Sequence, residues 1–390
     1  MSKSENDAFW LDKAKAVGAD LMRLDARRHH EQAPPTAELD LLKSAGLMSL
    51  AIGRENGGAG ISWRTVNEIV REITAADGSV GVLLGYHVIS VVHLRREDPT
   101  RRQALEREIT SNQFFLAGVA NPRDDDIQVE PLGGGYIFNG RKSFCTGAAF
   151  ADRLTIYGRM AETGQAALAY IPANRAGITY HHDWDNLGLC RTESGSFSVE
   201  NVRVQADELT IEADDERTAS IRALRTPVNH NIFTNCYLGF ALGAFRAARK
   251  YVGEKGQGWQ KLQPAAEDPL IVTQFGDIWV ELQAGIALAE RAALKVGVLL
   301  EGYPNFDEKQ RGDAAIDVAT AKIHASRAAI SISSKIFEPM GARSTHNRNA
   351  FDRFWRDSRT HTLHDPLIYK VFEVGDFALN QRYPEVGPYS

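Results

Sequence analysis

Residues 133–140 read GGGYIFNG, and this stretch decides the fold class because it predicts paired β-strands in the middle of a largely helical pattern. A glycine triplet precedes the apolar run Tyr136-Ile137-Phe138, and Asn139-Gly140 follows it. Asparagine and glycine tolerate the positive φ of a tight hairpin turn, so this pair predicts a turn. Short β-rich runs recur downstream, at 154–157, 167–171, 178–180 and 196–204. We therefore expect a small antiparallel β domain here.

Helical periodicity surrounds this region on both sides. Upstream, apolar residues at helical spacing predict helices at 8–28, 37–45, 63–76 and 78–94, with Thr36 as the N-cap of the second and Gly46 ending it. Downstream, the same spacing predicts four long helices, at 232–252, 272–300, 311–338 and 369–379. The order helices, strands, helices excludes the alternating pattern of a doubly wound sheet. We expect an α+β protein with an N-terminal helical domain (1–113), a β-barrel-like domain (114–212) and a C-terminal four-helix bundle (213–390).

The composition of the 390 residues is that of a globular protein. With 43% hydrophobic and 24% charged residues, disorder and fibrous architecture are excluded. Forty-five basic against 50 acidic side chains give a net charge of -5. A nucleic-acid partner is not expected, because neutralising phosphates requires a basic surplus or a basic stripe.

Cysteine usage and the N-terminus favour a cytoplasmic protein. The cysteines, Cys145, Cys190 and Cys236, are odd in number and lack C-x-x-C spacing, so neither a disulfide framework nor a thiolate metal site is expected. The first residues, MSKSENDAFWLDKAK, have no apolar run of signal-peptide length. No stretch approaches 18 uninterrupted apolar residues, so we expect no membrane span.

The glycine clusters do not predict a nucleotide-binding loop. Gly253, Gly256 and Gly258 follow a helical stretch rather than a strand, so they do not form a dinucleotide fingerprint. A phosphate-binding G-x-x-x-x-G-K-[ST] loop is also missing from the sequence. We expect that the chain has no nicotinamide-binding fold of its own.

Two histidines near the C-terminus could carry chemistry. In RTHTLHDP, His361 and His364 are three residues apart and would share a face if the segment is helical. Asp365-Pro366 is typical of an N-cap and first residue of a following helix. His364 could then exchange a proton near neutrality. On the pattern alone, structural hydrogen bonding is favoured over catalysis, and a metal pair is disfavoured because no third ligand has a telling spacing.

Two other polar positions have an ordinary structural interpretation and a functional one. Tyr86-His87 lies inside an apolar helical stretch, where a hydrogen-bonded core histidine is the more common outcome. Thr146, in the run FCTG, offers a hydroxyl beside Phe144, which by itself indicates no more than a strand end. The acidic run at 124–126 is typical of a solvated loop.

Taken together, several motifs resemble the acyl-CoA dehydrogenase fold superfamily across nearly the full chain. Within it, the chain is most similar to the flavin-dependent monooxygenases of group D, the branch of dibenzothiophene monooxygenase and the sulfur-acquisition enzymes. The motifs are ENGGAG (55–60), VREITAADGSVGVLLGYH (70–87), NGRKSFCTGA (139–148), TESGSFSVENVRV (192–204), FEPMGARSTH (337–346) and FDRFWRDSRTHTLHDPLIYKVFEVGDFALN (351–380). The last motif is the longest and the most specific.

The resemblance implies a fold, a cofactor and partners. Family members bind a flavin between the β domain and the bundle, and they assemble as tetramers, dimers of dimers, through the bundle. The monooxygenase branch takes reduced flavin, FMN ahead of FAD, from a separate NAD(P)H-dependent reductase. The reduced flavin and O2 form a C4a-(hydro)peroxyflavin, which would oxygenate a small hydrophobic (hetero)aromatic or organosulfur substrate at sulfur, nitrogen or carbon. A separate reductase would explain the missing nicotinamide fold.

One difference separates this reaction from thioester desaturation. Typical acyl-CoA dehydrogenases carry a glutamate base in the loop after an Arg-Asp pair such as Arg356-Asp357, whereas this chain has Thr-Leu-His-Asp at 362–365. Desaturation needs a carboxylate to remove the α-proton. The alternatives are an acyl-CoA dehydrogenase or nitroalkane-oxidase-like enzyme with Asp365 as base, and a flavin-free helical interaction protein.

The resemblance also assigns roles to individual residues. His364, assisted by His361, would handle the proton of the peroxide, and Thr146 would lie at flavin N5. Tyr86 and His87 would face the substrate, with His87 also catalytic. The residues expected to contact the flavin are Phe144, Cys145 and Thr146, together with Gly341, Ala342 and Arg343 toward the flavin of a neighbouring subunit. No metal is expected.

Two positions depart from the family pattern. Thr273-Gln274 stands where related flavoproteins often have a phosphate-binding arginine, and Gly118 lies near a position that is a flavin-proximal asparagine in the dibenzothiophene enzymes. The phosphate contacts are therefore open at this point.

Overall fold

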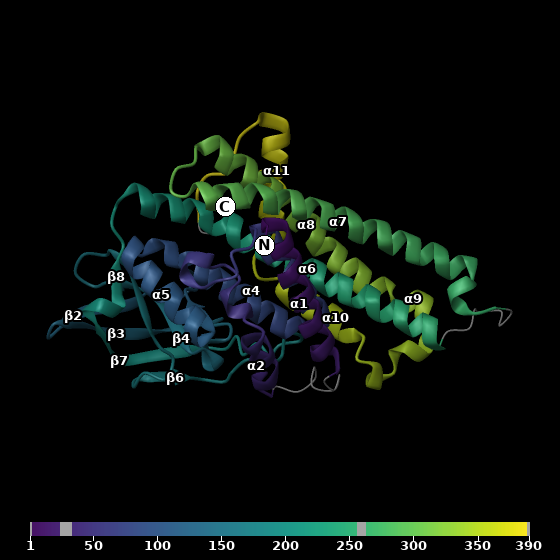
Figure 1. Cartoon of the computed structure of the whole chain (residues 1–390), viewed down its shortest axis with the longest axis horizontal. Coiled ribbons are helices and arrows are strands. Elements are labelled where there is room, and N and C mark those ends of the chain that lie inside the picture. Colours follow the sequence, from purple (N-terminus) through teal and green to yellow (C-terminus); the bar gives the residue numbers. More distant parts are fainter. Residues whose placement is uncertain (1, 24–32, 256–262, 388–390) are drawn as a thin grey trace.

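The computed structural model describes residues 2–23, 33–255 and 263–387. Its α-helices are α1 (Lys3–Arg23), α2 (Thr36–Ser44), α3 (Trp63–Ala76), α4 (Gly78–His93), α5 (Pro99–Asn112), α6 (Glu216–Lys255), α7 (Pro269–Gly302), α8 (Glu308–Lys335), α9 (Phe337–Met340), α10 (Asp352–His361) and α11 (Leu367–Asn380). The strands are β1 (Leu116–Val119), β2 (Ile127–Leu132), β3 (Gly135–Lys142), β4 (Arg153–Met160), β5 (Ala166–Pro172), β6 (Ile178–Tyr180), β7 (Phe197–Gln205) and β8 (Leu209–Ile211). The α+β fold class, with helices before and after the strands in the sequence, is confirmed (Figure 1).

The eight strands form one mixed sheet rather than a wholly antiparallel one. Their order is β6-β7-β3-β2-β4-β5-β8, and β1 pairs with β4 beside β2. Both β1 and β2 run parallel to β4, which the short apolar runs of the sequence did not reveal. The remaining pairs are antiparallel. The four downstream strands lie within a few residues of their predicted positions.

The predicted turn at Asn139-Gly140 is wrong. The chain instead turns at Gly133-Gly134, where both residues have positive φ (53° and 84°). Strand β3 continues through Asn139 and Gly140, with a shift of register against β7 between Phe138 and Gly140. Gly140 has φ of 151°, so its missing side chain serves a β-bulge rather than a hairpin loop.

The helix boundaries follow local capping signals. Ser62 accepts a hydrogen bond from the Thr65 amide at the start of α3, and Asp77 does the same for Val80 at the start of α4. Both of these helices lie where the periodicity predicts them. Thr36, in contrast, is the first residue of α2 rather than its N-cap, and Pro366 rather than Asp365 holds the N-cap position of α11.

The largest difference in the helices concerns α6. It begins at Glu216, well before the predicted residue 232, and continues through Pro227. A proline usually marks a helix boundary, but here packing keeps both sides helical. Helices α5 and α10 were not predicted. In the glycine cluster after the predicted helix at 232–252, Gly253 belongs to α6, whereas Gly256 and Gly258 lie outside the described residues.

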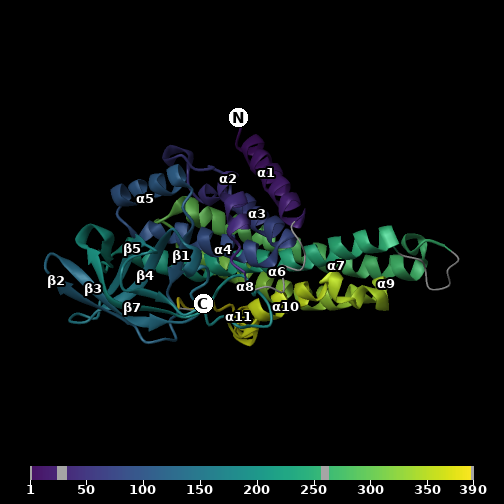
Figure 2. The same ribbon diagram turned by 90° about the horizontal axis from the view of Figure 1, so that it is seen from below.

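The helices before and after the sheet share one hydrophobic core. It contains residues of α3 and α4, such as Ile69 and Leu83, together with Phe240 of α6, Leu282 of α7 and Ala325 of α8. The sheet has a separate core of its own. Figures 1 and 2 show the sheet at one end of the molecule, with α6, α7 and α8 extending side by side toward the other. Helices α10 and α11 pack against α8. The domain boundaries stay a prediction.

Helix α4 is the most apolar part of the chain. The stretch Gly78–Arg96 is long and apolar enough to cross a membrane by length and composition, but 89% of its most apolar window is buried inside the protein. It packs against α3 and α6 on the helical side and against β1 of the sheet. Its composition is therefore that of a central core helix, buried on all sides.

Candidate active site

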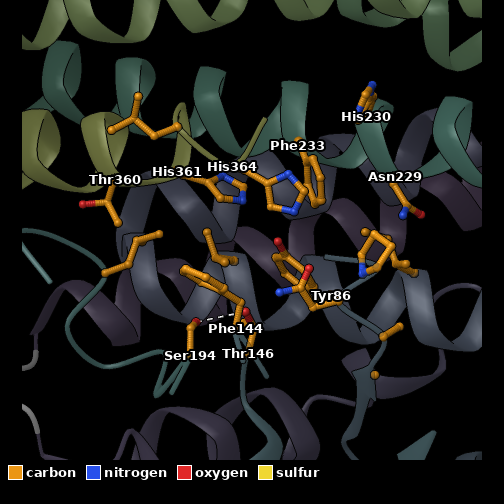
Figure 3. Close-up of a pocket in the computed structure, with 18 of the residues that line it drawn as sticks. Tyr86, Phe144, Thr146, Ser194, Asn229, His230, Phe233, Thr360, His361 and His364 are labelled. Carbon is orange, nitrogen blue, oxygen red and sulfur yellow. Dashed lines mark hydrogen bonds between the residues drawn. The ribbon is translucent and has the colours of Figure 1, made fainter. Parts of the chain in front are cut away.

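A cavity of about 640 Å³ lies where the sheet meets the helices. Its walls come from α4, from α6, from the loops after β1 and β3, from the segment between β6 and β7, and from the end of α10 with the loop that follows. Figure 3 shows that side chains from these segments converge on the cavity. Because its walls come from segments far apart in the sequence, the cavity exists only in the folded chain.

A buried arginine holds the segment between β6 and β7 in place. Arg191 donates to Glu38 of α2 at 2.6 Å and to Asp77, the N-cap of α4. The Leu189 amide nearby donates to Asp357 of α10 at 2.7 Å. Together these bonds join the segment to three helices that line or support the cavity, and all the charged groups are buried. Such a paired cluster is strongly destabilised when one partner is removed.

His361 is the last residue of α10 and is almost entirely buried, with 5% of its surface exposed. Aromatic rings surround it, including those of Phe233 and Tyr237 at centroid distances of 5.1 and 5.2 Å. Neither ring nitrogen has a hydrogen-bond partner within the described part of the chain. Burial lowers the pKa of His361 to about 3, so this imidazole is neutral. A buried polar group without partners is costly, and such groups occur mainly where a ligand or water completes the site.

His364 differs from His361 in its surroundings. It lies in the loop after α10, with its ring 6.3 Å from that of His361 and 4.8 Å from that of Phe233. Its Nδ1 is 3.1 Å from Oδ1 of Asp365. A carboxylate can only accept, so Nδ1 carries the proton and the Nε2 side of the ring is left for the cavity. The two histidines line one cavity, but His364 is not on the helix that contains His361.

The opposite wall carries a chain of three hydroxyls. Thr192 Oγ1 donates to the Leu189 carbonyl at 2.9 Å, so it must accept from Ser194 Oγ at 2.8 Å. Ser194 has then used its only proton, so it must accept from Thr146 Oγ1 at 2.9 Å (Figure 3). This order commits the Thr146 proton to Ser194. Thr146 consequently offers only lone pairs to the cavity.

Phe144 supplies an aromatic surface beside this chain. Its backbone has φ of 55°, a conformation that non-glycine residues seldom adopt. The side chain is 66% exposed and lies edge-on to Trp184 at 6.2 Å. An exposed ring held in a strained backbone conformation is suited to packing against a flat ligand. Tyr86, whose ring lies 5.3 Å from Phe233, also lines the cavity.

The structure does not support the catalytic and substrate roles expected for His87. The Leu116 amide donates to its Nδ1 at 3.0 Å, so its Nε2 carries the proton and donates to the Met48 carbonyl at 2.8 Å. Burial lowers the pKa of His87 to about 4, which agrees with a neutral ring. Both nitrogens are therefore used by backbone groups, and the side chain does not line the cavity. His87 is a structural residue that joins α4 to β1.

Four other residues expected to contact the flavin do not line the cavity. The Cys145 side chain packs in the core of the sheet, where burial raises the pKa of its thiol to about 12, and it does not line the cavity. Gly341, Ala342 and Arg343 follow α9, at the end of the bundle distant from the sheet (Figure 2). They do not line this cavity either, so a contact with a neighbouring subunit's flavin stays a prediction.

Sequence reasoning missed several residues of the cavity. Ser194, Phe233 and Trp184 line it, but the sequence assigned a role to none of them, although Ser194 lies in the motif at 192–204. Phe233 looked like an ordinary core residue because it repeats with the apolar residues of α6. The closely spaced hydroxyls Thr192 and Ser194 beside Gly195 were the one usable signal for the hydroxyl chain.

Comparisons with known proteins give one consistent result. The chain matches the acyl-CoA dehydrogenase N-terminal domain over residues 8–102 and the acyl-CoA dehydrogenase C-terminal domain over residues 232–367. It is 37% identical to dibenzothiophene monooxygenase of Rhodococcus erythropolis, over 90% of this chain and 88% of that protein. It is 36% identical to the probable FMNH2-dependent monooxygenase SfnC of Pseudomonas putida, over 97% and 96%. The crystal structure of FMN-bound TdsC from Paenibacillus sp. A11-2 superposes with a TM-score of 0.92, at 36% identity over 98% of this chain and 100% of that one.

Because His361 has no hydrogen-bond partner in the described ranges of the chain and His87 has two, substituting the two histidines should change the stability of the fold in opposite directions. At pH 8, His361→Phe should raise the free energy of unfolding by about 1–2 kcal/mol, because it removes an unpartnered polar group. His87→Phe, the matched control, should lower that free energy, because it leaves the Leu116 amide and the Met48 carbonyl unpaired. Urea unfolding followed by circular dichroism measures both. Equal losses in the two variants would contradict the assignment of His361 as unpartnered.

The same histidine predicts a pH dependence. Since the pKa of His361 is about 3 in the folded state and about 6.5 when unfolded, the unfolded chain binds the extra proton between these values. The titration of this group therefore has no effect on stability above pH 6.5, and it lowers the free energy of unfolding progressively as the pH falls below that value. At pH 5 the advantage of His361→Phe should increase by about 2 kcal/mol relative to pH 8.

Proposed function

The chain belongs to the acyl-CoA dehydrogenase family, and we propose that it is a two-component monooxygenase that uses reduced flavin and O2. The observation that carries this proposal is that a histidine pair faces an aromatic and hydroxyl wall across one cavity, and that no carboxylate is among the described residues that line it. The similarity to dibenzothiophene monooxygenase and to SfnC over most of the chain supports it.

Asp365 is poorly suited to the alternative reaction, desaturation of a thioester. Although burial raises the pKa of this carboxyl, hydrogen bonding to His364 and the charge of Lys322 hold it well below its usual range. Its Oδ2 lies 2.5 Å from the Lys322 ammonium. A carboxylate stabilised in this way is a weak base, because a general base works best with a pKa near the working pH. The acyl-CoA dehydrogenase and nitroalkane-oxidase alternatives are therefore disfavoured.

The residues of the cavity fit a reduced flavin, FMN ahead of FAD. A volume of about 640 Å³ is within the range of cofactor and ligand sites, and Phe144 presents an exposed ring to a flat ring system. N5 of a reduced flavin carries a hydrogen and can donate, whereas N5 of an oxidised flavin can only accept. Thr146, which offers only lone pairs, would therefore select the reduced form. When bound, the reduced flavin supplies the electrons that activate O2.

The chain's own residues would then manage protons and exclude water. His364, with Nδ1–H held by Asp365, would exchange a proton at Nε2, toward the cavity. The neutral His361 would offer a hydrogen bond in a dry environment, and the phenol of Tyr86 would help to orient the substrate. The aromatic and aliphatic side chains around them keep water away from the reacting atoms.

We propose a small hydrophobic substrate, oxygenated at sulfur, nitrogen or carbon. The walls of the cavity include apolar side chains from α4, α6 and the loop after α10, namely Val82, Ile89, Phe233 and Leu363. Such walls favour aromatic, heteroaromatic or organosulfur compounds. A separate NAD(P)H-dependent reductase would deliver the reduced flavin in the cytoplasm, which agrees with a sequence that lacks a dinucleotide fingerprint.

Exposed apolar side chains support a homo-tetramer arranged as a dimer of dimers. They occur on α7, as Leu270, Val272, Trp279, Val280, Leu294 and Val298, and on α11, as Ile368, Tyr369, Phe372 and Leu379. Monomeric proteins seldom expose this much clustered apolar surface. Burial of two separate faces is what a dimer of dimers requires.

A coupled assay tests the reaction. The purified protein is supplied with a flavin reductase, NADH, FMN and either dibenzothiophene or indole, and oxygenated product is measured by chromatography. We expect product with the native chain and a loss of about 100-fold or more in His364→Ala, because a general acid-base group contributes this much. In this variant, the electrons of reduced flavin that are not used to oxygenate the substrate should reduce O2 to hydrogen peroxide.

Three outcomes would contradict this assignment. An undiminished product yield in His364→Ala would remove the role of that histidine. Bleaching of bound flavin by an acyl-CoA or a nitroalkane would favour the dehydrogenase or oxidase alternative. Absence of binding to both oxidised and reduced flavin would favour a helical interaction protein.

The hydroxyl chain predicts a preference between flavin redox states. In Ser194→Ala the Thr146 proton is released, so Thr146 can donate to an oxidised flavin, and the ratio of reduced-to-oxidised affinity should fall about fivefold, the value of one hydrogen bond. Thr192→Ser keeps the order of donors and is the matched control. Anaerobic titration with oxidised and reduced FMN measures both dissociation constants. An unchanged ratio in Ser194→Ala would refute the donor order.

The exposed faces predict the effect of a single charge on assembly. Phe372→Asp on α11 should reduce the mass in light scattering from four times the 43.1 kDa chain to a smaller species, because an ionised carboxylate cannot be buried in an apolar interface. Leu132→Asp, at an exposed apolar position on β2, is the control and should leave the mass unchanged. A native chain that is monomeric at micromolar concentration would contradict the tetramer.

A further inference from the structure

A buried ion pair lies directly behind the histidine wall. Lys322 projects from α8, and its Nζ is 2.5 Å from Oδ2 of Asp365, in the loop before α11. Only 1% of Lys322 and 5% of Asp365 is exposed. The proposed reaction does not use Lys322 directly, because it is not among the residues that line the cavity.

The two oxygens of Asp365 have different tasks. Oδ1 accepts from Nδ1 of His364 at 3.1 Å, whereas Oδ2 faces Lys322 and, at 3.7 Å, Nε2 of His230 on α6. Lys370 of α11 also acts on this carboxylate, although it is paired with Glu373 at 2.8 Å. Asp365 is thus the link between a fixed cation and a histidine of the cavity.

A contribution to the stability of the fold does not by itself explain why Lys322 and Asp365 form a buried ion pair. Removing two charges from water costs several kcal/mol per ion, and replacing a buried pair with apolar residues is often neutral or stabilising. An aspartate that fixes the orientation and tautomer of a histidine, in contrast, is a recurrent device for proton transfer.

We propose that Lys322 and Asp365 are positioning residues for His364: the ammonium keeps Asp365 ionised, and the carboxylate holds the Nδ1–H tautomer, so that Nε2 presents its lone pair to the cavity. A proton that His364 takes up therefore arrives at Nε2 and leaves from Nε2, while Nδ1–H stays on Asp365. The inference rests on the proposed function, in which His364 exchanges that proton.

The electrostatics of the pair agree with an ionised carboxylate. Burial raises the pKa of Asp365, but hydrogen bonding to His364 and the charge of Lys322 hold it below its usual range. Burial lowers the pKa of Lys322, and Asp365 opposes this effect. Each partner thereby favours the charged form of the other.

Three variants separate positioning from structure. In Asp365→Asn the amide can donate to Nδ1 and favour the opposite tautomer, so product formation should fall about 10- to 100-fold and hydrogen peroxide should rise, with FMN affinity unchanged. Lys322→Met should unfold at a much lower temperature, because it leaves a buried carboxylate unpaired. Lys322→Met/Asp365→Asn removes both charges and should recover the melting temperature but not product formation. Recovery of both in the double variant would overturn the proposal.

A chemical probe tests the tautomer without flavin or turnover. Diethyl pyrocarbonate acylates an unprotonated imidazole nitrogen, and His364 is accessible enough to react, with a side chain that is 37% exposed. In the flavin-free native protein, peptide mass spectrometry should show acylation of His364 at pH 7, and Asp365→Asn should slow it about tenfold. The exposed His346 is the internal reference, and its rate should not change.

The acylation experiment also separates the positioning role of Asp365 from the proposed monooxygenase function. A native chain that forms no oxygenated product, but in which His364 acylation depends on Asp365, would refute the proposed function and leave the positioning pair intact. Equal acylation of His364 in the native protein and in both Asp365→Asn and Asp365→Glu would overturn the positioning role, whatever the outcome of the coupled assay.

Discussion

The buried bonds of Arg191 are the constraint on which the cavity depends. This guanidinium joins the segment between β6 and β7 to Glu38 of α2 and to Asp77 at the start of α4. The same segment holds Asp357 of α10 through the Leu189 amide. Because the segment also carries Thr192 and Ser194, the position of the hydroxyl wall relative to the histidine wall follows from these few bonds. One buried set of charges therefore fixes the position of both walls, which do not depend on flexible surface loops.

The polar groups of the cavity are organised in two opposite ways. The hydroxyl chain is fully committed, so each proton has one destination and Thr146 is left as an acceptor. His361 is instead left without partners among the described residues, although it is buried. A fold selected for stability alone would pair or remove such a group. The cavity thus combines a fixed acceptor, a neutral imidazole and a carboxylate-held imidazole, which suits the oxygenation proposed above.

Much of the architecture could be predicted from the sequence, because periodicity and capping are local. Helices α3 and α4 lie where apolar spacing predicts them, and the structure shows Ser62 and Asp77 as their N-caps. The turn at Gly133-Gly134 and the bulge at Gly140 could not be told apart, since both positions favour glycine and only the pairing of β3 with β7 decides between them. The parallel pairing of β1 and β2 with β4 is equally non-local.

By itself, the sequence determined the order of the elements and the residue types available for chemistry: histidines at 361 and 364, no glutamate between 362 and 365, and a threonine after an aromatic residue at 144. Only the tertiary structure decided which of these groups face a ligand. His87 and His361 look alike as residues in a sequence, but Met48 and Leu116 use both nitrogens of the first, while aromatic rings surround the second. The physical reason is that a histidine's role depends on its hydrogen-bond partners, and those partners come from segments that only folding brings together.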